Sequence, residues 1–402
     1  MAGEAASTDL GLTTPDAEAG RFRASTRGIV ARAGVACLIA GAVLILPLLS
    51  TDTWSRRIAL VAIFAIIGLS VNIITGHAGQ ISLGHQAFVG IGAFFSAFMF
   101  ARAGFGVALV GAGAMGGVMA LVLGLVALRV RGLYLALITL ALGIMAQGTI
   151  FNWREFTGGG AGLVAPRPGN FESDTAYAYL TLIFLGLFLF IDWRMVRSKA
   201  GRAIVAFRND ERVAATLGVN VTGYKLLAFV VGGVVAGVAG SLFAHRAGAV
   251  QAESFDLNTA LIWILMAVVG GLGSRAGVVI GSGFFALFQE VVPELYGKLP
   301  VGVRDAFIAI GVDEVTIIIV TPILGALLLI LTLTLYPGGI GQQLLPVRRW
   351  LAGGPFLHHE GPSKKKTKDK KKEKGGRKAE GAQEPAQAAP KASSASPGKK
   401  GD

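Results

Sequence analysis

Long apolar runs constrain the fold of this chain more than any other feature of its sequence. There are ten of them, at Ala33–Leu49, Ile58–Ile74, Ala87–Ala101, Phe105–Leu128, Leu133–Phe151, Tyr177–Trp193, Tyr224–Ala244, Thr259–Val269, Val278–Val292 and Val315–Tyr336. A helix needs about 20 predominantly apolar residues to cross a bilayer, and most of these runs approach that length. Ala87–Ala101 and Thr259–Val269 are shorter and fit half-helices or re-entrant segments as well as full spans. The pattern predicts an all-α polytopic transmembrane helical bundle of about ten helices.

The composition excludes a soluble domain with a large core. Apolar residues make up 53% of the chain and charged residues only 15%. Glycine accounts for 57 of the 402 residues, which is roughly twice its usual share and favours close contact between helix backbones in lipid. The single cysteine, Cys37, excludes a disulfide framework and a thiolate metal cluster. No metal site is predicted, because the five histidines lack metal-ligand spacing with carboxylates.

The chain divides into three parts by composition. Residues 1–28 begin with small and acidic side chains without apolar periodicity, so we expect a disordered N-terminal cytoplasmic segment. Residues 29–346 hold the apolar runs and form the predicted membrane domain. Residues 347–402 form a lysine-rich, low-complexity tail that we expect to remain disordered in the cytoplasm. Because no aromatic side chains are interleaved with the lysines of Lys364–Lys378, the tail favours anionic lipid over nucleic acid.

The distribution of charge between the runs predicts an orientation. An even number of spans places both termini on one side, together with the arginine-rich segment Ser198–Thr222. Positive loops stay in the cytoplasm, so we expect this side to be cytoplasmic and Asn152–Ala176, which is richer in acidic residues, to lie outside. Arg56 and Arg57 fall on the outer side and do not fit the rule.

Ser198–Thr222 is the longest polar interruption between apolar regions, and its local signals predict helices. Ala200–Phe207 is a short helical run, and Asn209 or Asp210 can cap a second helix that Gly218 ends. Asn220 or Thr222 can cap the apolar helix that follows.

Two interpretations of this segment remain open. A basic loop between spans is usually a solvated connector. Four apolar side chains interleaved with the charge favour instead an amphipathic surface that docks a partner protein; they are Val205, Phe207, Val213 and Leu217.

A second unusual stretch, Asn72–Phe88, follows directly on an apolar run. It combines glycine with uncharged hydrogen-bonding groups, and the candidate path residues are Gly79, Gln80, Ser82, Gly84, His85 and Gln86. Polar groups and broken helices at membrane depth are tolerated only where protein or a water-filled path satisfies them. The stretch therefore predicts a broken helix that lines a substrate path, or alternatively an ordinary loop between two helices.

Val269–Phe285 is a second glycine-interrupted apolar segment. Gly273, Gly277 and Gly281 recur every four residues, which predicts a smooth helix face for packing. Pairs of interrupted segments in the two halves of a chain also mark internal repeats around a transport path. Asn72–Phe88 and Val269–Phe285 fit such a repeat weakly.

The sequence holds no phosphate-binding motif of the type G-x-x-x-x-G-K-[ST]. Gly297–Lys298 is followed by Leu299, and Gly398–Lys399 by Lys400. If nucleotide powers a process here, another chain must bind it.

Four stretches carry a resemblance to a known family. Gly76–Phe94 (GHAGQISLGHQAFVGIGAF), Arg131–Leu140 (RGLYLALITL), Gly201–Ala228 (GRAIVAFRNDERVAATLGVNVTGYKLLA) and Val269–Gly281 (VGGLGSRAGVVIG) resemble, in the same order, motifs of the branched-chain amino acid ABC-importer permeases. The similarity covers roughly Ile58 to Gly341 and is nearer to the LivM-type of the two permease subunits.

The resemblance implies a permease subunit that forms half of the path of an ATP-driven importer for branched-chain or related amino acids. The expected partners are a second permease subunit of the LivH type, two cytoplasmic ABC ATPases, an extracytoplasmic substrate-binding protein and the lipid bilayer of the inner (plasma) membrane. No cofactor or catalytic residue is expected on this chain, because the ATPases would bind ATP and Mg²⁺. The ATPase would dock on Ser198–Gly218, through Arg208, Asp210, Glu211, Ala214, Ala215, Leu217 and Gly218.

Other functions compete with this one. Relatives of the family carry urea, amides or other amino acids. An ion-coupled secondary transporter would need a buried carboxylate, whereas Asp192, Glu290 and Asp313 are expected only at helix ends. A membrane scaffold with a basic tail would leave Gly76–Phe88 unexplained.

Overall fold

The computed structural model describes residues 51–127, 130, 132–300 and 302–305, with Gly34, Gly41, 45–48 and single residues between 313 and 341. These residues belong to the first of two units into which the chain divides, Met1–Gly354. The predicted terminal segments and most of the predicted first and last spans lie outside the described residues.

The described part is a helical bundle with one small β-ladder. Its helices are α3 (Asp52–Val71), α4 (His85–Ala127), α5 (Leu133–Gly148), α6 (Arg154–Thr157), α7 (Asp174–Arg197), α8 (Lys199–Asn209), α9 (Glu211–Thr216), α10 (Val221–Ala247), α11 (Leu257–Gly270) and α12 (Arg275–Gly297). A π-helical turn, η1 (Asn72–His77), extends α3, and short 3₁₀ turns lie at Ile150–Asn152, Gly159–Ala161, Gly169–Phe171 and Ala252–Phe255. Strands β1 (Leu163–Val164) and β2 (Ala249–Val250) pair antiparallel.

The all-α prediction is confirmed, and the apolar runs within the described residues are helices. Six helices there are long and apolar enough to cross a membrane, namely α3 with η1, α4, α5 with its 3₁₀ extension, α7, α10 and α12. The short run Thr259–Val269 forms α11, whose 14 residues make it shorter than a typical span.

Helix α4 consists of the two helices that the sequence predicts separately. The backbone leaves helical geometry at Gly104, where φ is +78°, a conformation open mainly to glycine. The two halves fold back on one another, since a Cβ on Gly111 would overlap the ring of Phe95. The runs that begin at Ala87 and Phe105 are therefore separate helices of a hairpin, the second described as far as Ala127.

Small residues bring α4 and α10 into close contact, as the glycine content predicts. A Cβ on Gly92 would overlap the backbone of Gly237, and one on Gly240 would overlap the carbonyl of Val89. Backbones that approach this closely gain van der Waals contact that larger side chains would prevent. The hairpin and α10 therefore form one packed unit.

Aromatic side chains fill the core beside this unit. Phe94, Phe151, Phe255 and Trp263 are buried, and Phe255 has its ring 5.9 Å from that of Phe94 and 5.6 Å from that of Phe151. The rings come from α4, the end of α5, the Ala252–Phe255 turn and α11. They hold the start of α11 inside the bundle.

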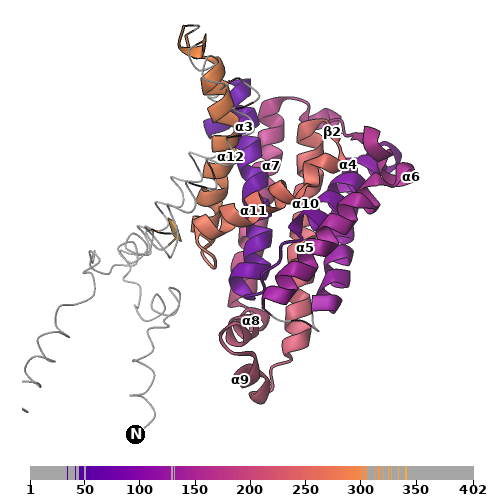
Figure 1. Cartoon of the computed structure of the whole chain (residues 1–402), viewed down its shortest axis with the longest axis vertical. Helices are drawn as coiled ribbons and strands as arrows, with labels where there is room; N and C mark the ends of the chain where they lie inside the picture. Colours follow the sequence, from indigo (N-terminus) through magenta and orange to yellow (C-terminus); the bar gives the residue numbers. More distant parts are fainter. Residues whose placement is uncertain are drawn as a thin grey trace, which may run out of the picture. The chain divides into compact units, whose positions relative to one another are not determined.

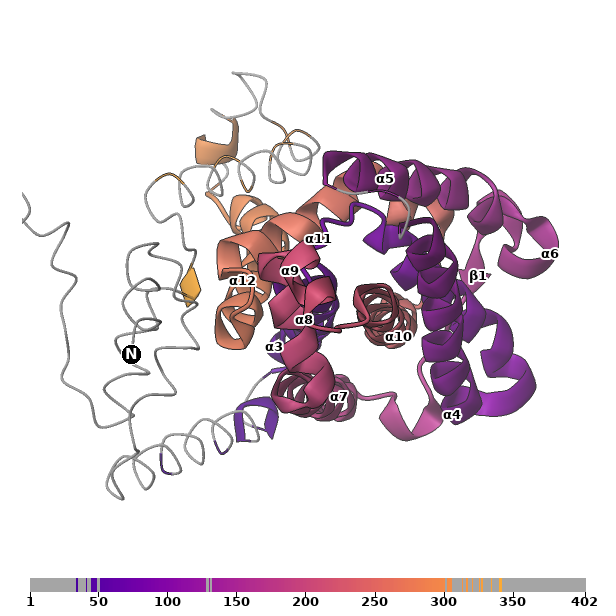
Figure 2. The same ribbon diagram turned by 90° about the horizontal axis from the view of Figure 1, so that it is seen from below.

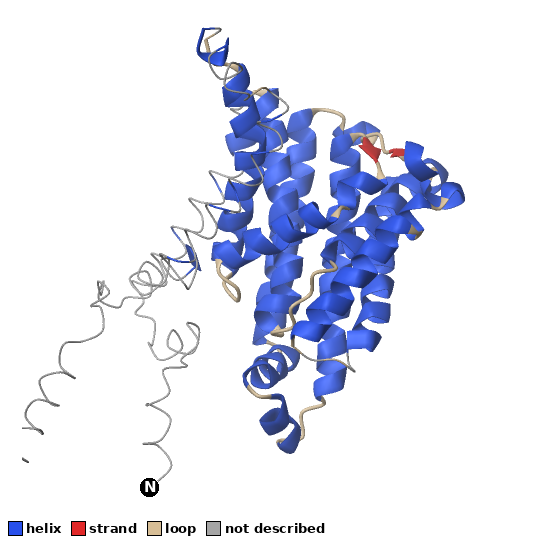
Figure 3. Ribbon diagram, in the orientation of Figure 1, coloured by secondary structure: helices blue, strands red, loops and turns tan. Residues whose placement is uncertain are grey.

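The two long polar segments lie at opposite ends of the bundle. Helices α8 and α9, which form Ser198–Thr222, lie at one end, whereas α6 and the two strands lie at the other (Figure 1; Figure 3). This arrangement agrees with the prediction that Ser198–Thr222 and Asn152–Ala176 are on different sides. Seen from the end that carries them, α8 and α9 lie over α3, between α10 and α12 (Figure 2).

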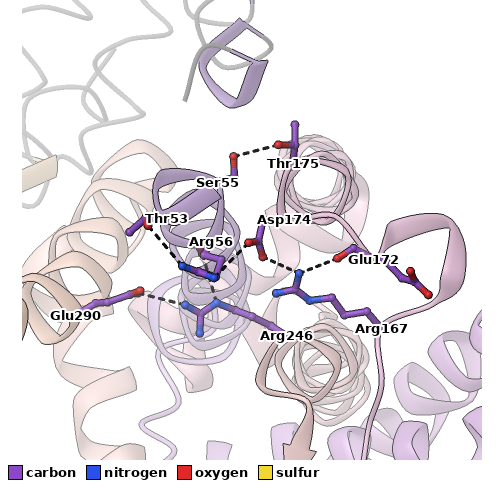
Figure 4. Close-up of polar contacts among 9 residues, drawn as sticks. All are labelled: Thr53, Ser55, Arg56, Arg167, Glu172, Asp174, Thr175, Arg246 and Glu290. Carbon is purple, nitrogen blue, oxygen red and sulfur yellow. Dashed lines mark hydrogen bonds and ion pairs between the residues drawn. The ribbon is translucent and has the colours of Figure 1, made fainter. Parts of the chain in front are cut away.

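The end opposite to α8 and α9 carries a network of ion pairs (Figure 4). Asp174, the first residue of α7, binds Arg167 at 2.7 Å and Arg56 at 3.4 Å. Arg246 binds Glu290 at 3.2 Å, and Arg57 pairs with Glu294. The two arginines that do not fit the positive-inside rule are thus each paired with a carboxylate.

Candidate transport site and coupling helices

The helix that begins at Asp52 ends in a wide turn before the candidate path residues. Its last turn, η1, has π-helical geometry, which is rare and frequent at functional sites. The chain then leaves the helix at Gly79, where φ is +66°, and resumes at His85. Two hydrogen bonds hold the break, from Gln80 N to Ile74 O at 3.1 Å and from Thr75 Oγ1 to Gln80 O at 3.2 Å. The apolar helix therefore ends within Asn72–Phe88, as both interpretations of this stretch require.

The structure divides the candidate path residues into an accessible and a buried group. Gly79 is exposed and Gln80 half-buried, whereas Ser82, Gly84, His85 and Gln86 are buried. The buried group includes two polar atoms without a hydrogen-bond partner among the described residues, Ser82 Oγ and Gln86 Oε1. Such atoms cost about 1–3 kcal/mol each when they stay unpaired, so they are able to receive a polar ligand.

The buried group packs against α5. Leu83 N donates to Thr139 Oγ1 at 2.9 Å, and a Cβ on Gly84 would overlap the carbonyl of Thr139. The amide of Gln86 lies against Gly143, where a side chain would displace it. The break is therefore held between α3, from which it leaves, and α5.

A second break separates α11 from α12. Gly271 and Gly273 have φ values of +98° and +87°, and the chain re-enters a helix at Arg275. The prediction of one helix face formed by Gly273, Gly277 and Gly281 is wrong for Gly273, because its positive φ ends helical geometry. Gly277 and Gly281 do lie on one helix, α12, where a Cβ on either would crowd the Gly270 backbone of α11.

The two breaks contact each other. Gly273 N donates to Asn72 Oδ1 at 2.7 Å, and a Cβ on Gly76 would lie 2.8 Å from Gly273 N. Asn72 and Gly273 are 201 positions apart in the chain. The tertiary structure therefore brings together the two glycine-interrupted segments that the sequence pairs only as a weak repeat.

Side-chain caps begin each helix in the polar segment between α7 and α10, and those of Asp210 and Asn220 were among the predicted alternatives. Ser198 caps α8, and Asp210 caps α9 by accepting from the backbone of Arg212 at 2.8 Å and of Val213 at 3.1 Å. Asn220 caps α10 through Gly223 N at 3.0 Å. Of the alternatives left open by the sequence, Asp210 and Asn220 are the caps, whereas Asn209 is the last residue of α8. We call α8 and α9 the coupling helices.

The apolar residues of the coupling helices point in two directions. Val213 and Leu217 are exposed, at 55% and 76% of their surface. Phe207 is buried and packs in a cluster with Ile204, Ala214, Ala78 and Ala228. The prediction that Phe207 belongs to the docking surface is therefore wrong, because this ring fixes α8 to the break and to α10.

The predicted coupling residues divide in the same way. Ala214 is buried and Glu211 half-buried, with an ion pair from Glu211 to Lys225 of α10. The remaining ones are exposed: Arg208, Asp210, Ala215, Leu217 and Gly218. The exposed residues are the ones that a partner could reach.

Arg208 joins the coupling helices to both breaks. A Cβ on Gly79 would lie 3.0 Å from Arg208 Cγ, and one on Gly273 would lie 3.4 Å from Arg208 Nη1. A cavity of about 250 Å³ opens beside this contact, and its lining includes Gly79, Gln80, Arg208, Asp210 and Glu211. The candidate path residues and the candidate coupling residues therefore meet at one place. Gly79 and Arg208, which belong to the two groups, are 129 positions apart in the chain.

A buried charge that was not predicted from the sequence lies beside the two breaks. Asp192 of α7 is fully buried rather than at an accessible helix end; its Oδ1 lies 3.0 Å from His77 Nε2, and its Oδ2 pairs with Arg275. The sequence does hold a signal for this buried charge, because an acidic residue inside an apolar run such as Tyr177–Trp193 needs a charged or hydrogen-bonding partner. Among the described residues, no group of three His, Cys, Asp or Glu side chains could hold a metal ion.

Comparison with known proteins places the chain in a family. Residues 55–336 match the family described as branched-chain amino acid transport system / permease component. The chain is 32% identical over 272 residues to the high-affinity branched-chain amino acid transport system permease protein LivM of Salmonella typhimurium, over 60% of this chain and 64% of that protein. Its identity to LivM of Escherichia coli is 32% over 275 residues, or 60% and 65% of the two chains.

A more distant similarity is to the autoinducer 2 import system permease protein LsrC of Escherichia coli, with 27% identity over 123 residues, 29% of this chain and 35% of that protein. The chain spans less than two thirds of the length of either LivM protein. No solved structure matches the chain significantly. The match over residues 55–336 includes both breaks and the coupling helices. The chain therefore belongs to the family of branched-chain amino acid transport system permease components.

Proposed function

We propose that this chain is one permease subunit of an ATP-driven importer for branched-chain or related amino acids. One observation carries the proposal: Arg208 of the coupling helices packs on Gly79 and Gly273 at the two breaks. A subunit without a phosphate-binding motif of its own must receive force from another chain, and this contact provides a route from the exposed coupling helices to the interrupted helices. Family membership and the apolar helices support the same assignment.

The proposed partners follow from this assignment. A second permease subunit of the LivH type would complete the path, and two ABC ATPases would bind ATP and Mg²⁺ and dock on the exposed face of α8 and α9. An extracytoplasmic binding protein would deliver substrate at the opposite end of the bundle. Both chain termini would then lie in the cytoplasm of a cell whose inner membrane holds the protein.

The broken segment suits an amino acid as cargo. A zwitterion that leaves water needs hydrogen-bonding groups along its way, and Ser82 and Gln86 have unpaired polar atoms at the break, beside the buried ring of His85. Gln80 borders the cavity beside Arg208. We propose that these side chains line or gate the path, and that ATP-driven movement of the coupling helices opens it.

The test is uptake of leucine, isoleucine and valine by cells that express the complete transporter with single alanine variants of Gln80, His85 and Gln86. We expect uptake to require the ATPase subunits, and the variants to change KM or the preference among the three substrates. Gln147→Ala is the control, because this half-buried glutamine of α5 lies outside the break. Normal membrane abundance must be shown for each variant. Unchanged uptake in all three variants would remove the path assignment.

One observation favours a second candidate, an ion-coupled transporter. Asp192 is the buried carboxylate that such a mechanism requires. Its pairing with Arg275, a permanently charged side chain, opposes the cycle of binding and release that ion coupling needs. Uptake that persists without the ATPase subunits and follows a proton or sodium gradient would favour this candidate.

A further inference from the structure

The residues Asp192, His77 and Arg275 form a network around a buried carboxylate where three elements meet. The Asp192 carboxylate on α7 lies 3.0 Å from the ring of His77 on η1 and pairs with Arg275, the first residue of α12. Asp192 and His77 are buried, and Arg275 is half-buried. His77 and Arg275 are 115 and 83 positions away from Asp192 in the chain, so this carboxylate is a tertiary junction.

The network is joined firmly to the coupling helices. Asp192 lies near the C-terminal end of α7, and α8 follows after one residue, Ser198. Ser198 Oγ donates to Met195 O at 2.6 Å and accepts from Gly201 N at 3.2 Å. A Cβ on Gly201 would overlap the carbonyls at the end of α7, so α8 packs directly on that end. A displacement of α8 must therefore move the end of α7 that carries Asp192.

The other side of the network belongs to the two breaks. His77 is the last residue of η1, two positions before Gly79, and Arg275 directly follows the Gly271–Ser274 turn. Asp192 thus holds the first break through His77 and the second through Arg275. Arg208 contacts the same two breaks through Gly79 and Gly273.

We propose that Asp192 is a positioning residue that converts movement of the coupling helices into a change at both breaks. This inference rests on the proposed function. Its physical basis is that a buried carboxylate paired with two cationic or hydrogen-bonding partners follows them closely, because separating buried opposite charges is costly. An apolar contact would let α7 slide past η1 and α12, whereas the ion pair ties their displacements together.

The test is the number of ATP molecules hydrolysed per amino acid imported by the complete transporter in proteoliposomes. We expect Asp192→Asn to keep assembly and basal ATP hydrolysis while raising this ratio about tenfold, within the range of typical coupling between sites. Asp192→Asn combined with Arg275→Gln should be no worse than the single variant, because both changes remove one interaction.

Asp174→Asn is the matched control. Asp174 lies on the same helix, also binds two cationic side chains, and is at the opposite end of the bundle (Figure 4). We expect this variant to leave the ratio unchanged. An unchanged ratio in Asp192→Asn, or an equal rise in Asp174→Asn, would overturn the inference.

Two further outcomes are decided in the same assay. If Asp192→Asn does not assemble, Asp192→Glu and Arg275→Lys keep the charges and change only their geometry, and a normal ratio in both overturns the inference. If the wild-type complex itself shows no ATP-driven uptake, the proposed function fails, and the inference with it. Normal wild-type coupling with a normal Asp192→Asn ratio removes the inference alone.

Discussion

At the scale of single residues, two glycines separate the effect of backbone conformation from that of a tertiary contact. Gly79 and Gly248 both have a positive φ, +66° and +80°. A Cβ on Gly248 would meet nothing within 4 Å, whereas one on Gly79 would lie 3.0 Å from Arg208 Cγ. Both positions favour glycine for its backbone conformation, but only Gly79 also requires space for the coupling helix.

We therefore expect Gly79→Ala to lower the melting temperature of the purified protein more than Gly248→Ala does. Each substitution places alanine at a positive φ, at a cost of about 1–2 kcal/mol, and Gly79→Ala also displaces Arg208. Adding Arg208→Ala should remove the excess, because it deletes the atoms that the new methyl group meets. Thermal unfolding in detergent measures all three variants. Equal shifts for the two alanine substitutions would show that Arg208 does not restrict Gly79.

At the scale of elements, the coupling helices have an inner and an outer side. Phe207 and Ala214 hold them to the bundle, and the Glu211–Lys225 ion pair ties α9 to α10. Val213 and Leu217 remain exposed at the end of the bundle. Single exposed apolar residues are common, whereas adjacent ones form the patches that mark docking surfaces. Val213 on α9 and Leu217 at its C-cap lie four positions apart and are candidates for such a patch.

We expect Leu217→Asp to reduce co-purification of the ATPase subunits and to lower uptake without loss of membrane abundance. A central contact of this kind contributes about 1–3 kcal/mol to an interface. Val164→Asp is the control, since Val164 is exposed to 75% against 76% for Leu217 but lies at the other end of the bundle. Glu211→Lys is less specific, because it also breaks the pair with Lys225. If Leu217→Asp retains the ATPase, α8 and α9 are a solvated connector.

At the scale of the whole molecule, the proposed orientation places the coupling helices in the cytoplasm. The coupling helices and the paired arginines around Asp174 lie at opposite ends (Figure 1; Figure 4). Arg56, Arg57 and Arg246 pair there with Asp174, Glu294 and Glu290. Because the positive-inside rule counts Lys and Arg rather than net charge, Arg56 and Arg57 remain an exception to it.

The orientation predicts a difference in chemical labelling. Single cysteines replace Glu172 and Ala215, both exposed, in a Cys37→Ala background. We expect an impermeant maleimide to label position 172 in intact cells and position 215 only after the membrane is permeabilised. The reverse pattern would place the coupling helices outside and exclude docking of a cytoplasmic ATPase.

Local signals in the sequence were sufficient for the helices and for many of their ends. Apolar runs predicted every long helix in the described residues, and the capping roles of Asp210 and Asn220 were among the predicted alternatives. Caps and breaks act over a few residues, so their spacing is visible in the chain itself. The stretch Asn72–Phe88 was identified for the same reason, because polar groups interrupt an apolar run there.

The tertiary structure alone decided which of these local features meet. It turned Phe207 inward, separated Gly273 from the helix of Gly277, and placed the two breaks against each other through Asn72. It also buried Asp192 between His77 and Arg275. Contacts between residues tens to hundreds of positions apart depend on how helices pack, and periodicity within one helix carries no information about its neighbour. The sequence by itself therefore determined the elements and the family, whereas packing decided which residues join α8 and α9 to the two breaks.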